Sequence, residues 1–483
     1  MSYNKSSMSY EDCELLMLTS STNEIKKVVG KEKAQSPEVR RIIGIVEKFI
    51  RQTKSICYGG TAINDILPKK DQFYDRDYEI PDYDFFSDNA VELAVSLADK
   101  YKKAGFRDIV AQSGIHYGTY KVFVNFIPVA DITYIPTDLY KRLLRDSIVK
   151  GGIHYCPPDY LRMSMYLELS RPMGDVSRWE KVYSRLKLLN KHYPMDGVKY
   201  TFKKVDEVIW EDVSRHSKAT LNATIRKFCE KNGAVFFGSF AYNYYAKSFD
   251  KKAEFPYQKN IPDFDVFLEN PVERAKELKA SIIKSSTGDD GGEFTDEDIE
   301  IFFQEQYLDI IGERASVYIK GHKIITMYEP LACHNYSEIR YMSQKVRIAT
   351  IDTILSMYFM FQYTNEDPTI IHRLACMCYY LFQIQNRYAC RSTTSLKRFS
   401  LPCYGTQHTL ESLRSIKLAK YLELYKYKNK PNHEKYEEYM RWFLKYIPLK
   451  DVDTMSASKT KTRSKSTSRS PRSKSRSYSG FNI

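Results

Sequence analysis

The spacing of apolar residues in the first 200 positions predicts alternating helices and strands. Between residues 38 and 52 the apolar side chains recur with a period near 3.6, and Ser36 with Pro37 gives a helix start signal. Further helices are expected at 61–67 and 91–104, and a helical pattern covers 158–192. Short apolar runs typical of strands lie at 55–58, 83–86, 109–111, 119–126 and 129–134.

The same order of features returns later in the chain. Each copy has a turn of small residues after a strand, and then two aspartates separated by one aromatic residue: Gly59-Gly60 and Asp82-Tyr83-Asp84 in the first copy, Gly238-Ser239 and Asp263-Phe264-Asp265 in the second. The offset is 179 residues at the glycines and 181 at the aspartates. Preserved order at a near-constant offset predicts two related units in tandem.

These patterns divide the chain into five predicted segments. The fold class is α+β or α/β, with two tandem units followed by a helical region. The segments are an N-terminal segment 1–36, a first unit 37–195, a second unit 196–345, a helical region 346–453, and a Ser/Arg/Lys tail 454–483 expected to be disordered.

Composition narrows the class of protein. The chain has 483 residues and 43% hydrophobic residues, enough for packed cores, and it has no apolar run long enough to predict a membrane span. The polar first residues predict no secretory signal. Nine cysteines without a CxxC pair favour reduced thiols in an intracellular protein, without structural zinc.

The net charge of +14 points to a polyanionic partner. Eight basic residues and no acid lie in 454–483, which leaves +6 for the rest of the chain. A basic body with a strongly basic tail favours nucleic acid, although the charge could also serve solubility alone.

The first unit carries the residues for phosphate chemistry. Gly59 and Gly60 let the backbone approach a phosphate, and the helix expected to start at Thr61 would present amide donors to it. Asp82 and Asp84, two residues apart on an extended segment, share one face. Asp131 adds a third carboxylate from another strand.

Three clustered carboxylates suit two Mg²⁺ or Mn²⁺ ions, about 3.5–4 Å apart. Such a site activates an attacking 3′-hydroxyl and neutralises a pyrophosphate leaving group. Asp138 and Asp146 are rivals for the third position, but the pattern places them in a helix or loop.

The second unit serves as an internal control. Its third strand, around 323–330, is expected to place Ile325 where the first unit has Asp131. Without the third carboxylate this unit would keep the fold and lose catalysis. The alternative is a second active site that uses another acid, such as Asp309 or Glu313.

At this point the chain resembles the polymerase-β-like nucleotidyltransferase superfamily. Within it, the sequence is similar to the poly(A) polymerase catalytic subunits of large cytoplasmic DNA viruses, above all of mimivirus-like giant viruses and more distantly of poxviruses. The segments that carry the resemblance are 57–62, 80–86, 131–134 and 178–186.

The resemblance implies a template-independent adenylyltransferase that uses ATP and extends an mRNA 3′ end. It also implies an active first unit, an inactive second unit and a homodimer that does not enter a membrane. The place of action would be the host cytoplasm, at the viral factory, with packaging in the virion as a further option.

Basic residues after the first unit are candidates for nucleotide contact. Arg178 and Lys181 recur at helical spacing and could bind the triphosphate, but a solvated charged face explains them equally well.

Two other functions stay open. A CCA-adding enzyme would use a related glycine motif and a base-selecting segment like 211–215, although Asn64 stands where that motif has arginine. A non-catalytic RNA-binding scaffold would use the basic surface and the tail.

Overall fold

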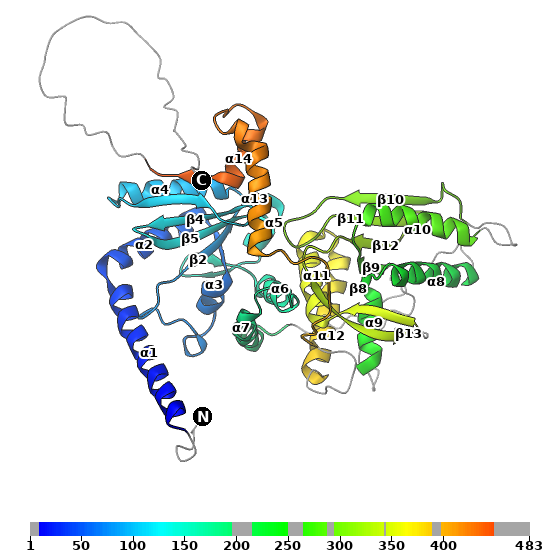
Figure 1. Cartoon of the computed structure of the whole chain (residues 1–483), viewed down its shortest axis with the longest axis horizontal. Helices are drawn as coiled ribbons and strands as arrows, with labels where there is room; N and C mark the ends of the chain where they lie inside the picture. Colours follow the sequence, from blue (N-terminus) through cyan, green and yellow to red (C-terminus); the bar gives the residue numbers. More distant parts are fainter. Residues whose placement is uncertain are drawn as a thin grey trace, which may run out of the picture. The chain divides into compact units, whose positions relative to one another are not determined.

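The computed structural model describes residues 9–195, 215–249, 264–286, 294–341, 344–388 and 398–448. The predicted tail, 454–483, lies outside these residues. The described part of the chain divides into two compact units, one drawn from the described residues of 1–156 and 411–483 and the other from those of 157–410 (Figure 1). Each unit contains one eight-stranded mixed sheet.

Unit 1 is built around a sheet of order β16-β3-β4-β5-β2-β1-β7-β6. Helices α2 and α4 pack against this sheet, and α1 packs on α2 (Figure 1). The core lies between the sheet and these helices. The elements are α1 Tyr10–Gln35, α2 Pro37–Thr53, β1 Ile56–Tyr58, α3 Gly59–Ile66, β2 Tyr83–Ser87, α4 Ala90–Lys103, β3 Ile109–Ser113, β4 Thr119–Val124, β5 Ile127–Tyr134, α5 Thr137–Arg145, β6 Ile148–Lys150 and β7 Ile153–Tyr155.

Unit 2 repeats this architecture. Its sheet has the order β10-β11-β12-β9-β8-β14-β13-β15, and α8 and α10 pack against it. The elements are α8 Arg215–Lys231, β8 Val235–Phe236, α9 Ser239–Phe249, β9 Phe264–Phe267, α10 Pro271–Ser286, β10 Ile299–Gln304, β11 Arg314–Ile319, β12 His322–Tyr328, β13 His334–Tyr341, β14 Gln344–Ala349 and β15 Cys403–Tyr404.

Seven strands of each sheet correspond one to one. Taken in order along the sheet, β3-β4-β5-β2-β1-β7-β6 match β10-β11-β12-β9-β8-β14-β13, and every neighbouring pair has the same parallel or antiparallel sense. The predicted tandem repeat of two α/β units is therefore confirmed at the level of strand topology.

A helical layer completes unit 2. Helix α6 packs on α11, and α7 and α12 pack beside them. Their bounds are α6 Pro158–Leu169, α7 Trp179–His192, α11 Ile351–Thr364 and α12 Pro368–Tyr388. Each pair follows the strand β7 or β14 of its own repeat, so the duplication extends to these helices.

The segment 411–448 returns to unit 1. It contains α13 Leu410–Leu424, α14 Glu434–Phe443 and β16 Lys445–Tyr446, and β16 pairs with β3 to form one edge of the sheet. The phenol of Tyr446 donates to Asp99, and Lys417 donates to the carbonyl of Gly114 at 2.6 Å. The two compact units thus have other boundaries than the predicted segments, because the predicted segments follow the internal repeat of the sequence.

Two features depart from the sequence analysis. Residues 10–35 form the long helix α1, for which no element was predicted. Cys333 and Cys403 form a disulfide, so the expectation that all cysteines are reduced is wrong for this pair. Pairing of β15 with β13 brings these distant residues together, which their spacing did not indicate. Among the described residues, no helix is both long and apolar enough to cross a membrane.

Candidate active site

The paired aspartates begin strand β2, in the middle of the unit 1 sheet. Tyr83 and Phe85 are buried in the core, with 1% and 0% of their surface exposed. Because side chains alternate along a strand, Asp84 lies on the opposite face, and Asp82, just before the strand, shares that side. Strand β5 runs parallel to β2 and places Asp131 directly opposite Asp84. The structure therefore puts the predicted carboxylates on adjacent segments of one face.

The carboxylates influence one another. Burial raises the pKa of Asp82, the negative charge of Asp131 raises it further, and the positive charge of Lys121 opposes both effects. Mutual repulsion of this kind is expected where several carboxylates face one cation site.

On the same face, an aromatic stacking contact and a hydrogen bond connect neighbouring strands. The ring of Tyr58 stacks on Phe86 with centroids 3.9 Å apart, and its hydroxyl lies 2.9 Å from Oγ1 of Thr133. These contacts connect β1, β2 and β5 beside the aspartates, so the three strands that form the site are held in register.

Gly59 is required by its surroundings. Its φ of +72° lies in the left-handed region, and a Cβ added there would stand 2.5 Å from Oδ2 of Asp84. The turn therefore fits closely around the second aspartate. Helix α3 begins at Gly59 rather than at Thr61, and its N-cap residue Tyr58 makes no side-chain cap. The first turn, which includes Gly60, thus presents amides at a helix N-terminus, as anion binding requires.

Thr61 contacts the segment that carries the paired aspartates. Its hydroxyl donates to the backbone oxygen of Asp82 at 2.7 Å, and the residue is only 5% exposed. Thr61 therefore fixes the start of the DxD segment, while its predicted contact with the nucleotide stays a prediction.

The loop between α3 and β2 is anchored by buried polar groups. The side-chain oxygen of Asn64 accepts from the amides of Phe73 and Tyr74, both at 2.8 Å. Arg76 donates to Asp65 at 2.6 Å. These interactions attach the loop to α3, and the sequence analysis predicted none of them.

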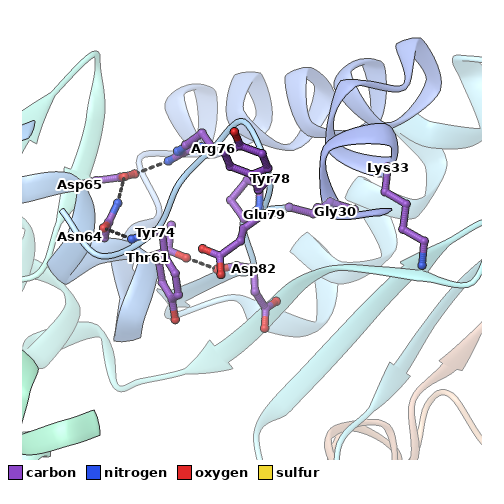
Figure 2. Close-up of a pocket in the computed structure, with 12 residues that line it drawn as sticks. Gly30, Lys33, Thr61, Asn64, Asp65, Tyr74, Arg76, Tyr78, Glu79 and Asp82 are labelled. Atoms are coloured by element: carbon purple, nitrogen blue, oxygen red, sulfur yellow. Dashed lines mark hydrogen bonds and ion pairs between the residues drawn. The ribbon is translucent and has the colours of Figure 1, made fainter. Parts of the chain in front are cut away.

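A cavity of about 390 Å³ lies beside this loop (Figure 2). Of the predicted site residues it includes Thr61 and Asp82, which are hydrogen-bonded to each other. It is lined by Gly30, Lys33, Thr61, Asn64, Asp65, Tyr74, Arg76, Tyr78, Glu79, Ile80, Pro81 and Asp82.

Lys121 is a site residue that the sequence analysis missed. It lies on β4 directly opposite Asp131, and its Nζ forms an ion pair with Oδ2 of that aspartate. The signal in the sequence was the hairpin 119–134, but its register shifts near the turn, between Val122 and Phe123. Counting along the chain could not give that register.

Arg178 and Lys181 belong to unit 2. Arg178 pairs with Glu168 at 3.2 Å, and Lys181 lies in the first turn of α7. Their predicted contact with a nucleotide stays a prediction. Asp138 and Asp146 lie in α5 and at its C-terminal end, as expected for residues outside the carboxylate cluster.

The second unit preserves the close approach of a glycine to an aspartate. A Cβ on Gly238 would stand 2.5 Å from Oδ2 of Asp265, the same close approach as between Gly59 and Asp84. Asp263 lies outside the described residues.

The counterpart of Asp131 is Thr326, which lies opposite Asp265 in the pairing of β12 with β9. The predicted counterpart, Ile325, is wrong by one residue. Ile325 is fully buried and faces the core, because a shift of one position turns a strand side chain to the other face. The second unit therefore lacks the third carboxylate, as predicted, and has a threonine at that position.

The carboxylate oxygens are hard donors that suit Mg²⁺ or Mn²⁺. Asp84 and Asp131 are in register, and Asp82 is close enough to Asp131 for their charges to interact. In the described residues no three acidic, histidine or cysteine side chains are gathered tightly enough to hold an ion. In its chemistry, the donor set of the three aspartates fits a divalent cation.

The same sheet topology and the same close approach of a glycine to an aspartate occur twice in this chain. Comparisons with known proteins bear on its class. Residues 44–175 match the family described as "Poly(A) polymerase catalytic subunit", which confirms the resemblance expected from the sequence.

Related viral proteins and one solved structure extend this result. Curated relatives that are named, provisionally, as poly(A) polymerase catalytic subunits occur in African swine fever virus (29% identity, 52% of this chain, 56% of the relative) and Acanthamoeba polyphaga mimivirus (32% identity, 33% and 27%). The matched region thus spans about half, or less, of these relatives. The crystal structure of the Megavirus polyadenylate synthase has a TM-score of 0.73 at 21% identity, over 88% of this chain and 86% of that chain. It shows the shared fold.

Proposed function

We propose that this protein is a template-independent polynucleotide adenylyltransferase that adds poly(A) from ATP to mRNA 3′ ends. The observation that carries the proposal is the register of Asp131 with Asp84, beside the uncapped N-terminus of α3. The names of the viral relatives support ATP and RNA as substrates. The presence of Thr326 in place of the third acid supports assigning catalysis to unit 1 alone.

The proposed chemistry divides among residues of unit 1. The backbone at Gly59 and Gly60 and the first turn of α3 would receive the triphosphate. Asp82, Asp84 and Asp131 would hold two divalent ions, which when bound lower the pKa of the attacking hydroxyl and neutralise the leaving pyrophosphate. Asp131 would orient the 3′-hydroxyl of the RNA for in-line attack. Arg178 and Lys181 remain candidates for the triphosphate.

The test is a labelled RNA primer incubated with each NTP separately, with and without Mg²⁺ or Mn²⁺. Long tails from ATP alone support poly(A) synthesis, whereas addition of a few C and A residues would indicate a CCA-adding enzyme. Asp131→Asn should lower the rate by about 100-fold or more, and Asp265→Asn should leave it near the wild-type value. Unchanged activity in Asp131→Asn would contradict the assignment of the catalytic site. A wild type that extends the primer with none of the NTPs would favour a non-catalytic RNA-binding scaffold.

We also propose that the protein is a homodimer. Helix α1 has no buried residue over its 26 positions, and it exposes a set of large apolar side chains. A helix of this kind is marginal alone and is stabilised when a partner covers its apolar side. The exposed set is Tyr10, Leu15, Leu16, Met17, Leu18, Ile25, Val28 and Val29. Light scattering should give twice the chain mass, and Leu18→Glu with Ile25→Glu should give a monomer; a monomeric wild type would contradict the proposal.

The place of action that we propose is the cytoplasm of the infected host cell, at the viral factory, with packaging in virions as an option. The viral origin of the relatives supports it. Immunofluorescence of infected cells and immunoblots of purified virions test the two sites.

A further inference from the structure

Lys121 forms an ion pair with an aspartate that the proposed mechanism needs as a metal ligand. Its Nζ contacts Oδ2 of Asp131, and the two residues face each other across β4 and β5. The side chain of Lys121 is 41% exposed, and that of Asp131 is 17% exposed. The lysine can therefore leave this contact for solvent without disturbing the core.

The second unit shows what the same position looks like without an acid. Ser316 lies opposite Thr326 across β11 and β12, as Lys121 lies opposite Asp131. The two hydroxyl oxygens are 3.0 Å apart and form a neutral, buried hydrogen bond. Within this one chain, the lysine thus accompanies the third carboxylate, and a neutral pair stands where the carboxylate is missing.

An ammonium group and a divalent cation compete for the same carboxylate oxygen. Both are positive, so each also repels the other at contact distance. Lys121 is the one cation that the described contacts place on Asp131, and it also opposes the repulsion between Asp82 and Asp131.

We propose that Lys121 is a positioning residue that holds Asp131 before a divalent cation binds and competes with that cation for the carboxylate. This inference rests on the proposed function of the three aspartates as metal ligands. It predicts that Lys121 sets the cation concentration at which the site fills. The lysine reduces the negative charge of the unliganded site at the cost of weaker metal binding.

The experiment measures Mn²⁺ binding to the full chain without ATP or RNA, by the electron paramagnetic resonance signal of free Mn²⁺. The variants are Lys121→Met, Lys121→Arg and Asp131→Asn. Lys141→Met serves as a matched control, since Lys141 is an exposed lysine on α5 of the same unit. Lys121→Gln is a second neutral variant, for use if the methionine variant does not fold by circular dichroism.

Removal of the positive charge should lower the Kd for Mn²⁺ by about tenfold. Lys121→Arg and Lys141→Met should stay close to the wild type, because both leave a cation at position 121. An unchanged or higher Kd in Lys121→Met or Lys121→Gln, while Asp131→Asn abolishes binding, would overturn the inference and leave the proposed function intact. If the wild type shows no Mn²⁺ binding that depends on Asp131, the metal site of the proposed function fails, and the inference fails with it.

Discussion

The contact between Gly59 and Asp84 makes a sharp prediction, because the second unit offers a matched position. In Gly59→Ala the new Cβ would lie 2.5 Å from Oδ2 and 3.3 Å from Cγ of Asp84, at a φ of +72°. The left-handed conformation costs about 1–2 kcal/mol for alanine. The atomic movements that relieve the clash cost additional free energy. We therefore expect the free energy of unfolding to fall by roughly 2–3 kcal/mol and the Tm to fall by roughly 5–10 °C.

The effect on activity should exceed the effect on stability. Displacing the Asp84 carboxylate by a fraction of an ångström misplaces a proposed metal ligand, and misplacements near 1 Å cost about 100-fold in rate. Gly238→Ala creates a comparable clash without a left-handed φ, because its Cβ would lie 2.5 Å from Oδ2 and 2.8 Å from Cβ of Asp265. It should also destabilise the protein but leave polyadenylation near the wild-type rate.

The assay is primer extension with ATP at saturating Mg²⁺, run below the Tm of each variant, beside thermal melting. The informative quantity is the ratio of rates between the two alanine variants. Near-wild-type activity in Gly59→Ala, or an equal loss in both variants, would refute the argument that the turn at Gly59 shapes the catalytic aspartate.

Three further predictions concern charge, a buried ion pair and the disulfide. The pKa of Asp82 is raised by burial and by Asp131, so this carboxylate favours folding at low pH and opposes it as pH rises through its raised pKa. Asp82→Asn should therefore raise the Tm at pH 7 without metal, and the gain should vanish as pH falls below about 4; a gain that is constant with pH would contradict this cause. Arg398→Gln should cost about 3–5 kcal/mol in urea unfolding, because Arg398 binds both oxygens of Asp352, which is 0% exposed; a loss below 1 kcal/mol would show that the charge is stabilised otherwise. The Cys333→Ser, Cys403→Ser double variant should lose about 2–4 kcal/mol, since the bond spans 70 residues, and a reducing agent should bring the wild type to the same Tm if the crosslink is the cause.

Several parts of the protein were predictable from the sequence because they are local or periodic. The DxD pair shares a face through strand alternation, and Gly59 marks a turn that only a residue without Cβ can occupy beside Asp84. The repeat was visible because both copies kept the order and spacing of these local features.

Other parts depend on register and on contacts between distant segments. Strand pairing alone shows that Thr326, rather than Ile325, corresponds to Asp131, since one position reverses the face of a side chain. The same applies to Lys121, whose contact with Asp131 depends on a hairpin with an irregular register. The sequence therefore determined which chemical groups this protein has and roughly where its units lie. The tertiary structure decided which groups meet. Pairing of β16 with β3 and the bond between Cys333 and Cys403 join residues whose separation along the chain carries no signal of their proximity, and the Lys121–Asp131 ion pair depends on a register that the chain alone does not give.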